Sequence, residues 1–342
     1  MAAVGNNVLT LADWAKRVDA SGKTPDIVNL LSQTNEALVD SLWKPSNMPA
    51  AERIIQRTGL PTAYYRMLNK GVPKSKSTTA QMDEPIAILE ARSELDAEIA
   101  ELNGNSAAFR LSEAEAFIEA MNQKAATTLL YGSAANPEEF VGLSNRYSAL
   151  SGVANSQNVI NAGSVSGGDA TSIWLIGWGP KSVYMTFPNG SKAGLIHEDL
   201  GLGDAFDSNN DRFRAYMDRY VWKHGLVLKD WRYAVRICNI DSSVLAGDNT
   251  GATINLVNLM LKALHRLPSY AGGMSPDGET WRGIKPVFYV NRTVREMLDI
   301  QAASKSNLLL AVGEEEGRLK TTLRGVPIRT MDAIVMNEST VS

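Results

Sequence analysis

The chain has 342 residues, of which 44% are hydrophobic and 21% are charged, and its formal net charge at pH 7 is −3. This composition is ordinary for a globular protein, and the length suits two or three subdomains. A net charge close to zero argues against a dedicated nucleic-acid-binding protein, which usually carries a strong basic excess. It permits casual, non-specific contact with DNA.

Cys238 is the only cysteine, so the chain cannot form an internal disulfide. Its place in the apolar run 234–238 predicts a small buried side chain. No apolar run approaches the roughly 20 residues that span a bilayer, and residues 1–7 lack the charged start and apolar stretch of a signal peptide. We therefore expect a soluble protein that is made in the cytoplasm and has no membrane partner.

Residues 8–48 predict two short amphipathic helices. In the second, apolar residues recur at helical spacing between Ile27 and Leu42. Thr24-Pro25 supplies an N-cap followed by a proline in the first turn. Such helices pack either on the core of their own subunit or on a neighbouring subunit, and the pattern does not distinguish the two.

Residues 50–95 contain two strand-like runs, 54–58 and 86–90, separated by a long polar segment. The middle of this segment, residues 69–79, is rich in turn-forming residues and carries three lysines but no carboxylate. Loops longer than about 12–15 residues are uncommon in compact domains unless they are functional or disordered. Two interpretations follow: a structureless basic loop, or an extended hairpin that reaches across a partner subunit.

The extended-hairpin interpretation predicts which side chains would contact a partner. Two tyrosines near the base of the segment would supply amphipathic contact area, and the neighbouring cations would supply charge. The predicted inter-subunit contact residues are Tyr64, Tyr65, Arg66, Lys70, Lys74 and Lys76.

A long helix is predicted over Ser112–Tyr131. Ser112, followed three residues later by Glu115, forms a capping-box pattern. An apolar face runs from Ala116 to Leu129, and Gly132 ends the pattern. At 1.5 Å per residue, the helix would be about 25–30 Å long.

Residues 133–170 are rich in loop-forming residues, and β-structure is predicted after them. The strand-like runs 172–178 and 182–187 flank a Gly-Pro-Lys turn, which predicts a hairpin. Two longer alternating runs flank a turn at His224-Gly225 and predict an antiparallel ribbon with aromatic cross-strand pairs. These runs are residues 214–222 and 226–237.

After residue 247 helices and strands alternate, which predicts a separate α/β subdomain. The predicted elements are a helix over 254–266, a strand over 286–290, a helix capped by Thr293 and running to about Ala303, and strands over 318–323 and 326–330.

The residue types that carry catalysis or bind metals are scattered. His197, His224 and His265 stand alone, without the spacing of metal ligands. The glycine-based motifs that cradle phosphates or present a nucleophile are missing. The sequence therefore predicts no catalytic residue, no cofactor and no metal ion.

Two acidic segments need separate interpretation. Residues 207–218 imitate a calcium-binding loop, but Arg212 stands where that loop needs glycine and Asp218 replaces a bidentate glutamate. A solvated turn is predicted instead. Glu314–Glu316 predict a solvated loop, and in a symmetric assembly a pairing with the lysines of residues 70–76 is a further hypothesis.

Several segments resemble the major capsid proteins of short-tailed phages. The first reads Gly-Leu-Pro-Thr-Ala-Tyr-Tyr-Arg-Met-Leu-Asn-Lys-Gly-Val-Pro-Lys-Ser-Lys-Ser-Thr over residues 59–78, and residues 89–96 and 120–123 add to it. The resemblance extends over nearly the whole chain. It implies the Hong Kong 97-type fold, which has an N-terminal arm, an extended hairpin loop, a peripheral domain with a spine helix, and an axial domain.

This resemblance implies an α+β fold class and a set of boundaries. They are an N-terminal arm over 1–48, an extended β-hairpin loop over 49–95, a peripheral domain over 96–247 with spine helix 112–131 and a β-ribbon, and an α/β axial domain over 248–342. The ribbon-like strands 173–187 and 214–240 precede the segment that looks axial, whereas in most relatives the ribbon closes the chain. A circularly permuted order of the fold is therefore expected.

The resemblance implies a structural protein of the virion and not an enzyme. Such a subunit self-assembles into pentamers and hexamers, which form an icosahedral shell around double-stranded DNA. Its expected partners are copies of itself and scaffolding, portal and decoration proteins, with non-specific proximity to packaged DNA. The alternatives are another phage component, such as a decoration or tail protein, and an enzyme that uses scattered carboxylates in a pocket.

Overall fold

The structure is a computed structural model of the chain, and it describes most residues after position 30. The described residues are 31–102, 106–163, 165, 168–207, 210–247, 254–268, 284–304, 310–315 and 318–342. They form two compact units, each assembled from separate stretches of the chain. The first helix predicted within residues 8–48 and the start of the second lie outside the described part. Of the second, predicted to reach Leu42, the described residues form only the short helix Glu36–Asp40.

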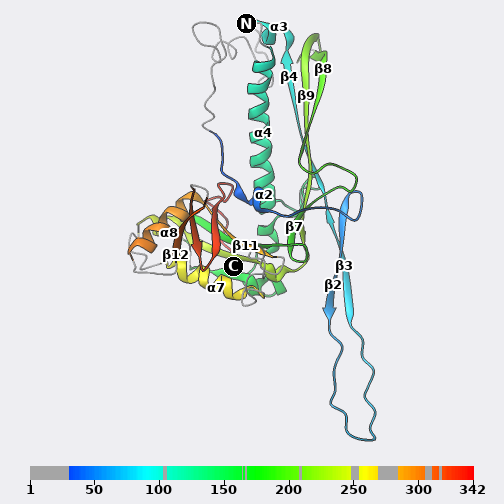
Figure 1. The fold of residues 1–342 in the computed structure, drawn as a ribbon, viewed down its shortest axis with the longest axis vertical. Coiled ribbons are helices and arrows are strands. Elements are labelled where there is room, and N and C mark those ends of the chain that lie inside the picture. The colour runs from blue at the N-terminus through cyan, green and yellow to red at the C-terminus, as the bar shows by residue number, and fades with distance from the viewer. Residues whose placement is uncertain are drawn as a thin grey trace. The chain divides into compact units, whose positions relative to one another are not determined.

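The first unit combines one long helix with long strands (Figure 1). Its described residues are 31–34, 88–102, 106–127, 192–207 and 210–223. Its elements are β4 (Ala87–Asp96), α3 (Ala97–Glu101), α4 (Ser106–Tyr131), β8 (Leu195–Phe206) and β9 (Arg212–Leu228), of which α4 and β9 continue into the second unit. Strand β8 pairs with β9 in a long antiparallel hairpin.

Helix α4 ends at Tyr131 as predicted, but it begins at Ser106 and not at Ser112. The predicted capping box is wrong, because Ser112 lies inside the helix and its hydroxyl donates to the Phe109 carbonyl at 2.9 Å. Gly132 follows the helix at a point where two backbone segments meet. A Cβ there would lie 2.2 Å from the Phe140 carbonyl oxygen, so only glycine fits.

Strand β9 is continuous, so the turn predicted at His224-Gly225 is wrong. His224 is buried, and a Cβ on Gly225 would lie 2.6 Å from the Pro85 carbonyl oxygen. Glycine at this position permits a close approach of two chain segments, and not a turn. The ribbon that forms is the β8–β9 hairpin.

The turn of the β8–β9 hairpin is the segment that imitates a calcium loop. The Asp207 amide donates to the Asp211 carbonyl at 2.9 Å, and the Asp211 amide donates to the Asp207 carboxylate at 2.8 Å. Both aspartates are exposed. The predicted solvated turn is confirmed at Asp207 and Asp211, whereas Asp218, the last residue of the calcium-loop pattern, is buried in β9.

A mixed sheet forms the centre of the second unit, whose residues are 35–87, 128–191 and 224–342. The strand order is β12-β13-β14-β11-β6, with β10 on the other edge of β6 and β5 beside β10. These strands are β5 (Val159–Asn161), β6 (Ala170–Trp178), β10 (Ala234–Asp241), β11 (Lys285–Val290), β12 (Leu310–Glu315), β13 (Arg318–Leu323) and β14 (Val326–Thr330). Every residue of β6 is buried, as expected for a central strand covered on both faces.

Two helices pack on this sheet, α7 (Leu256–Arg266) and α8 (Arg292–Ser304). The core joins Leu175 of β6 to Met260 of α7 and Leu298 of α8. Both predicted helices and the strands β11, β13 and β14 are confirmed. Thr293 was predicted to cap α8, but the capping side chain is that of Asn291. Its carbonyl oxygen accepts a hydrogen bond from the Thr293 backbone amide at 3.1 Å. Among the described helices, none is long and apolar enough to cross a membrane.

Shorter elements complete the second unit. They are α2 (Glu36–Asp40), β1 (Trp43–Pro45), β2 (Ala51–Gly59), β3 (Thr78–Pro85), α5 (Leu143–Arg146), η1 (Ala154–Asn158), β7 (Val183–Phe187), η2 (Trp231–Tyr233) and α6 (Ser242–Gly247). Strands β6 and β7 do not form the predicted hairpin. They meet in parallel at Trp178 and Val183, because β10 and β11 occupy the two edges of β6.

The two units divide the chain differently from the predicted peripheral domain (96–247) and axial domain (248–342). Strands β6 and β10 precede residue 247, yet they share one sheet with β11, which follows it. Of the ribbon-like runs 173–187 and 214–240, the parts in β6 and β10 join this sheet, whereas residues 214–222 pair with β8 in the first unit. The expected circularly permuted order stays a prediction. Alternation along a strand shows that it is a strand but not which partner it takes.

Candidate assembly surfaces

The strands β2 and β3 form a two-stranded antiparallel hairpin, which we call the arm (residues 51–85). Its ladder runs from the pair Ala51–Pro85 to the pair Gly59–Thr78. Figure 1 shows the arm extending away from the β6–β11 sheet, with the loop between its strands at the far end. We call this loop, residues 60–77, the tip. An extended hairpin is therefore present, but its second strand is β3 and not the predicted run 86–90, most of which lies in β4. Its reach across a partner subunit stays a prediction.

The tip is an irregular loop with a tight turn at its end. The Lys70 amide donates to the Met67 carbonyl at 3.2 Å, and Asn69 adopts a φ of 61°, a left-handed conformation that asparagine tolerates. The Ser75 hydroxyl donates to the Thr62 carbonyl at 2.9 Å and joins the two legs of the loop.

Every residue of the tip is exposed, including six large apolar or aromatic side chains. These are Leu60, Tyr64, Tyr65, Met67, Leu68 and Val72. The same residues include four cations and no carboxylate. Aromatic, aliphatic and cationic side chains concentrated on one exposed loop are typical of a surface that a partner covers.

The structure places all the predicted contact residues together on the tip. They are Tyr64, Tyr65, Arg66, Lys70, Lys74 and Lys76. The two tyrosines lie beyond the last paired residue, Gly59, and so not at the base of the arm as predicted. Their contact with another subunit remains a prediction. The loop predicted at Glu314–Glu316 is wrong for Glu314 and Glu315, which end strand β12 and pair with β13. The hypothesis that Glu314–Glu316 pair with these lysines concerns side chains outside the described part of the chain.

The base of the arm is held by two buried glutamates. Both terminal nitrogens of Arg146 donate hydrogen bonds to the carboxylate of Glu84 in β3, at 2.6 and 2.7 Å. The Nε of the same guanidinium donates to the Val141 carbonyl at 3.1 Å. Glu84 is 4% exposed and Glu52 is 6% exposed. A bidentate, buried pair of this kind fixes geometry strongly.

Glu52 of β2 has a different set of partners. The Tyr184 hydroxyl donates to it at 2.8 Å, the Asn47 amide donates at 2.6 Å, and Lys229 lies 3.8 Å away. Burial and the hydrogen bond to Glu52 raise the pKa of Tyr184. We call Glu52, Glu84, Arg146, Tyr184 and Lys229 the root cluster.

Sequence reasoning missed the root cluster. One signal was available: Glu52 stands two residues before Ile54, so both side chains lie on the same face of β2. Ile54 packs with Tyr184 and Val227 in a buried cluster. A carboxylate on a buried face demands a buried partner. Nothing local could identify Arg146, because it lies 62 positions from Glu84.

The first unit carries an acidic surface with an apolar groove. Residues 88–127 and 192–223 contain 14 Asp and Glu against eight Lys and Arg, a net charge of −6. One ridge of α4 lines the groove together with side chains of β8 and β9. The lining residues include Ala107, Leu111, Ala114, Ile118, His197 and Tyr220. Leu111 and Ile118 are 63% and 45% exposed, an unusual state for aliphatic side chains on a helix.

Ion pairs order the acidic rim of this groove. Arg110 of α4 lies 2.8 Å from both Asp199 and Asp218, and His197 lies 2.8 Å from Asp218. The hydrogen bond from Arg110 holds the pKa of Asp199 below its ordinary value. On the same unit, hydrogen bonds from Arg219 and Arg92 lower the pKa of Glu90 to about 2. These carboxylates therefore stay charged at neutral pH.

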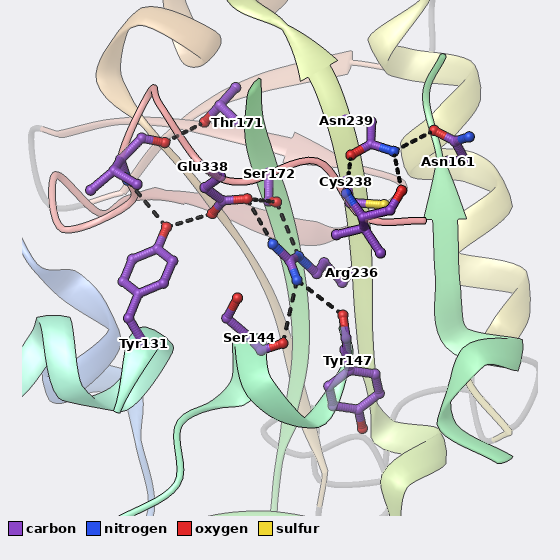
Figure 2. A network of polar contacts seen from close by, with 12 residues as sticks. Tyr131, Ser144, Tyr147, Asn161, Thr171, Ser172, Arg236, Cys238, Asn239 and Glu338 are labelled. Atoms are coloured by element: carbon purple, nitrogen blue, oxygen red, sulfur yellow. Dashed lines mark hydrogen bonds and ion pairs between the residues drawn. The ribbon is translucent and has the colours of Figure 1, made fainter. Parts of the chain in front are cut away.

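Figure 2 shows a buried polar network in the second unit that ties the last described residues to the sheet. Arg236 of β10 donates to Glu338 at 2.8 Å, to the Ser172 hydroxyl at 3.1 Å and to the Tyr147 carbonyl at 3.0 Å. The Tyr131 hydroxyl donates to the second oxygen of Glu338 at 2.5 Å, and the Ser172 hydroxyl donates to the first. Because these groups use one another as partners, the network holds the fold together and offers no free functional group.

The described residues offer little for catalysis or metal binding. Among them, no group of three or more His, Cys, Asp or Glu side chains could hold a metal ion. Cys238 is buried as predicted. Burial raises the pKa of its thiol to about 11, so the thiol is protonated at neutral pH and is a poor nucleophile.

Comparison with known proteins assigns the family. The model of the family described as Major capsid protein GP7 matches residues 19–342. The chain belongs to this family. No curated protein is a significant match.

Solved structures agree with the family. The structure of bacteriophage Epsilon15 has a TM-score of 0.77 and 28% sequence identity, and the match covers 100% of this chain and 99% of that chain. The capsid of bacteriophage JBD30 matches with a TM-score of 0.47 and 9% identity, over 89% of this chain and 92% of that one. The SrpI encapsulin complex from Synechococcus elongatus matches with a TM-score of 0.44 and 14% identity, over 68% and 97%. Only the first of these is similar enough to support an argument.

This capsid protein has the α+β fold of Hong Kong 97-type phage shells. It is a major capsid protein of a tailed bacteriophage, and its copies assemble into the capsomers of the icosahedral shell of the virion. The alternative of a decoration or tail component is therefore wrong. The family and the fold are those of structural proteins, and the surfaces described above are the ones available for assembly.

Proposed function

We propose that the arm is the extended loop of the capsid subunit and that its tip docks on a neighbouring subunit of the shell. The observation that carries this proposal is the composition of the tip, where six exposed large apolar or aromatic side chains accompany four cations and no carboxylate. Leaving such apolar area in water is unfavourable. In a symmetric shell, a second copy of the chain stands at a fixed place beside every arm.

The docking surface is the acidic first unit of the neighbour. Its net charge of −6 complements the four cations of the tip, and its groove presents Leu111 and Ile118 to the tip's aromatic side chains. Opposite charges steer the encounter and fix its register. Burial of apolar area supplies most of the favourable free energy.

The other roles follow the plan of the fold. We assign residues 1–48 to the N-terminal arm, residues 49–95 to the extended loop, the first unit with its spine helix α4 to the peripheral domain, and the sheet of the second unit to the axial domain. Subunits then form pentamers and hexamers around packaged double-stranded DNA. Scaffolding, portal and decoration proteins are further partners in this proposal, and no catalytic step takes part.

Deleting residues 66–78 tests the proposal. We expect full-length protein to form closed particles in negative-stain electron microscopy and the deletion variant to remain as free subunits or small oligomers. The deletion variant should keep the melting temperature of the body, because the tip packs on no described core cluster. Normal shells from the deletion variant would overturn the proposal.

A matched control separates loss of the tip's chemistry from loss of its length. In one variant the tip's six large apolar or aromatic residues become serine at unchanged length. In the control, Val153→Ser removes an apolar side chain that is 56% exposed outside the arm and the groove. The first should fail to assemble and the second should assemble normally.

A further inference from the structure

The root cluster contains an arrangement that ordinary strand pairing avoids. Glu52 and Glu84 are direct partners across the β2–β3 ladder, and both are almost completely buried. Like charges directly opposite one another destabilise an antiparallel pair, and a buried charge is costly unless it is paired. Hydrophobic residues at both positions would avoid these costs, so the stability of the hairpin alone does not account for the two glutamates.

Each glutamate binds a different part of the body. Glu84 binds Arg146 at the end of α5, whereas Glu52 binds Tyr184 of β7 and faces Lys229 beyond the end of β9. These contacts with the body oppose the repulsion between the two carboxylates. The two carboxylates repel one another, and each is held by its own partners, so the arm is attached to the body at two separate points.

Few contacts beyond the root cluster hold the arm. Among the described residues, the Asn47 side chain exchanges two hydrogen bonds of 2.8 Å with the backbone of Arg53. Gln56 donates to the Lys229 carbonyl at 2.8 Å, and Ile54 packs with Tyr184 and Val227. From residue 57 to the tip, the interactions that the structure records along β2 and β3 lie within the arm itself. The root therefore decides where the tip points.

The arm acts as a lever on this root. Eleven residues separate Gln56, the last residue that the body holds, from the turn at Met67, which at about 3.3 Å per residue corresponds to at most about 36 Å of extended chain. A rotation of roughly 10° at the root would then displace the turn by up to about 6 Å. A shift of that size would take the tip off any docking surface that is built on side-chain contacts.

We propose that Glu52 and Glu84 are arm-positioning residues, which aim the tip at the neighbouring subunit before the two subunits meet. This inference rests on the proposed function of the tip. Pre-organisation reduces the conformational freedom that is lost on docking, and it raises the effective concentration of the tip at its target. The paired glutamates thus contribute to assembly without touching the partner.

The test compares two neighbouring rungs of the same ladder. Glu84→Gln keeps the size of the side chain and breaks the buried pair with Arg146. Asp83→Asn is the matched control, because Asp83 pairs with Arg53 one rung away and both side chains are about half exposed (44% and 45%). A Glu84→Arg, Arg146→Glu double variant exchanges the partners and serves as a rescue.

The direct measurement is a distance distribution within the subunit. Spin labels are attached to Ser77→Cys on the tip and to Lys181→Cys between β6 and β7, outside the arm, in full-length protein that carries Cys238→Ala. Their separation is measured by pulsed electron paramagnetic resonance. We expect Glu84→Gln to widen the distribution at least twofold and to slow shell assembly about tenfold in light scattering. Asp83→Asn should change neither, and the exchange variant should recover part of both.

The outcomes separate this inference from the proposed function. An unchanged distance distribution in Glu84→Gln would overturn the positioning role, and so would a widened distribution with a normal assembly rate. Normal assembly after deletion of residues 66–78 would overturn the docking role of the tip, whatever the distance distribution shows. If Glu84→Gln fails to fold, Glu52→Gln provides the same comparison, since the single glutamine oxygen can accept from the Asn47 backbone amide while its NH2 group donates to the Tyr184 hydroxyl, which lie on different oxygens of Glu52.

Discussion

The root and the tip lie at opposite ends of the arm and differ in almost every physical respect. At the root, charges are buried and each has a partner inside the chain. At the tip, apolar and cationic side chains are exposed, and the loop carries no carboxylate to neutralise them. The root is complete in one subunit, whereas the tip presents a surface that only another molecule can cover. The 35 residues of the arm thus include both a buried, fully paired attachment to the body and an exposed surface that needs a partner.

A buried ion pair deep in the sheet provides the reference for how strongly such a pair holds the fold. Arg236→Met removes the guanidinium and leaves Glu338 buried without its cation. We expect the free energy of unfolding to fall by about 3–5 kcal/mol, the usual cost of breaking a buried pair. Urea denaturation of the unassembled full-length chain measures it.

The control for this variant is an exposed pair. Arg292→Met removes a guanidinium that is 70% exposed and lies 2.7 Å from Asp332. Exposed pairs contribute about 0–1 kcal/mol, so this change should be small. Equal losses in the two variants would contradict the idea that burial, and not pairing alone, makes these charges structural. Breaking the buried pair at the root should lower the free energy of global unfolding by less than Arg236→Met does, because the arm can detach locally while the rest of the subunit stays folded.

The opposite result is expected at the tip. Tyr65→Ser should leave the unfolding transition unchanged, because this side chain is fully exposed in the subunit. If the side chain becomes buried on docking, its loss costs about 1.5–3 kcal/mol per contact. The subunit concentration needed for assembly should then rise about tenfold or more. Sedimentation across a dilution series measures this concentration, and a value equal to that of the unmodified protein would remove Tyr65 from the interface.

A smaller effect is expected from the charges of the tip. Replacing Lys70, Lys74 and Lys76 by glutamine removes three of its four cations. At low salt, assembly should become slower, because steering toward the acidic first unit is lost. Added salt screens such steering, so the unmodified protein should slow toward the variant as salt rises. A salt dependence identical in both proteins would show that these lysines do not face the acidic surface.

Local patterns in the sequence predicted elements better than their partners. The helices at 256–266 and 292–304 and the strands at 318–323 and 326–330 agree with the predicted periodicity, because each is defined by residues close together in the chain. The strand pairings were wrong wherever glycine suggested a turn, since Gly225 serves a close approach of two segments. Alternation alone could not show that β6 pairs with β10 and β11.

The candidate surfaces divide in the same way. The tip was predictable, because its cations and tyrosines are adjacent in sequence and lack carboxylates. The root cluster was not, because Glu84 and Arg146 are brought together only by the fold. The groove of the first unit was missed for a similar reason, since one of its sides is the strand β8, which the sequence analysis did not identify as a strand.

The last prediction compares the reactivity of an exposed thiol on the tip with that of a buried thiol in the core of the same molecule. In the Ser77→Cys variant the chain carries two thiols, the introduced one on the exposed tip and the buried Cys238. Burial raises the pKa of Cys238 to about 11 from an ordinary value of 9. At pH 8 a smaller fraction of Cys238 than of an exposed cysteine is therefore the reactive thiolate. This fraction becomes large only as the pH approaches 11. Alkylation followed by mass spectrometry should therefore modify the introduced thiol within minutes at pH 8 and leave Cys238 intact, until urea or strongly alkaline pH exposes or ionises it. Rapid modification of Cys238 at pH 8 in the folded protein would mean that the β10 sheet opens far more readily than its buried residues indicate, and the contrast between a closed body and an open tip would fail.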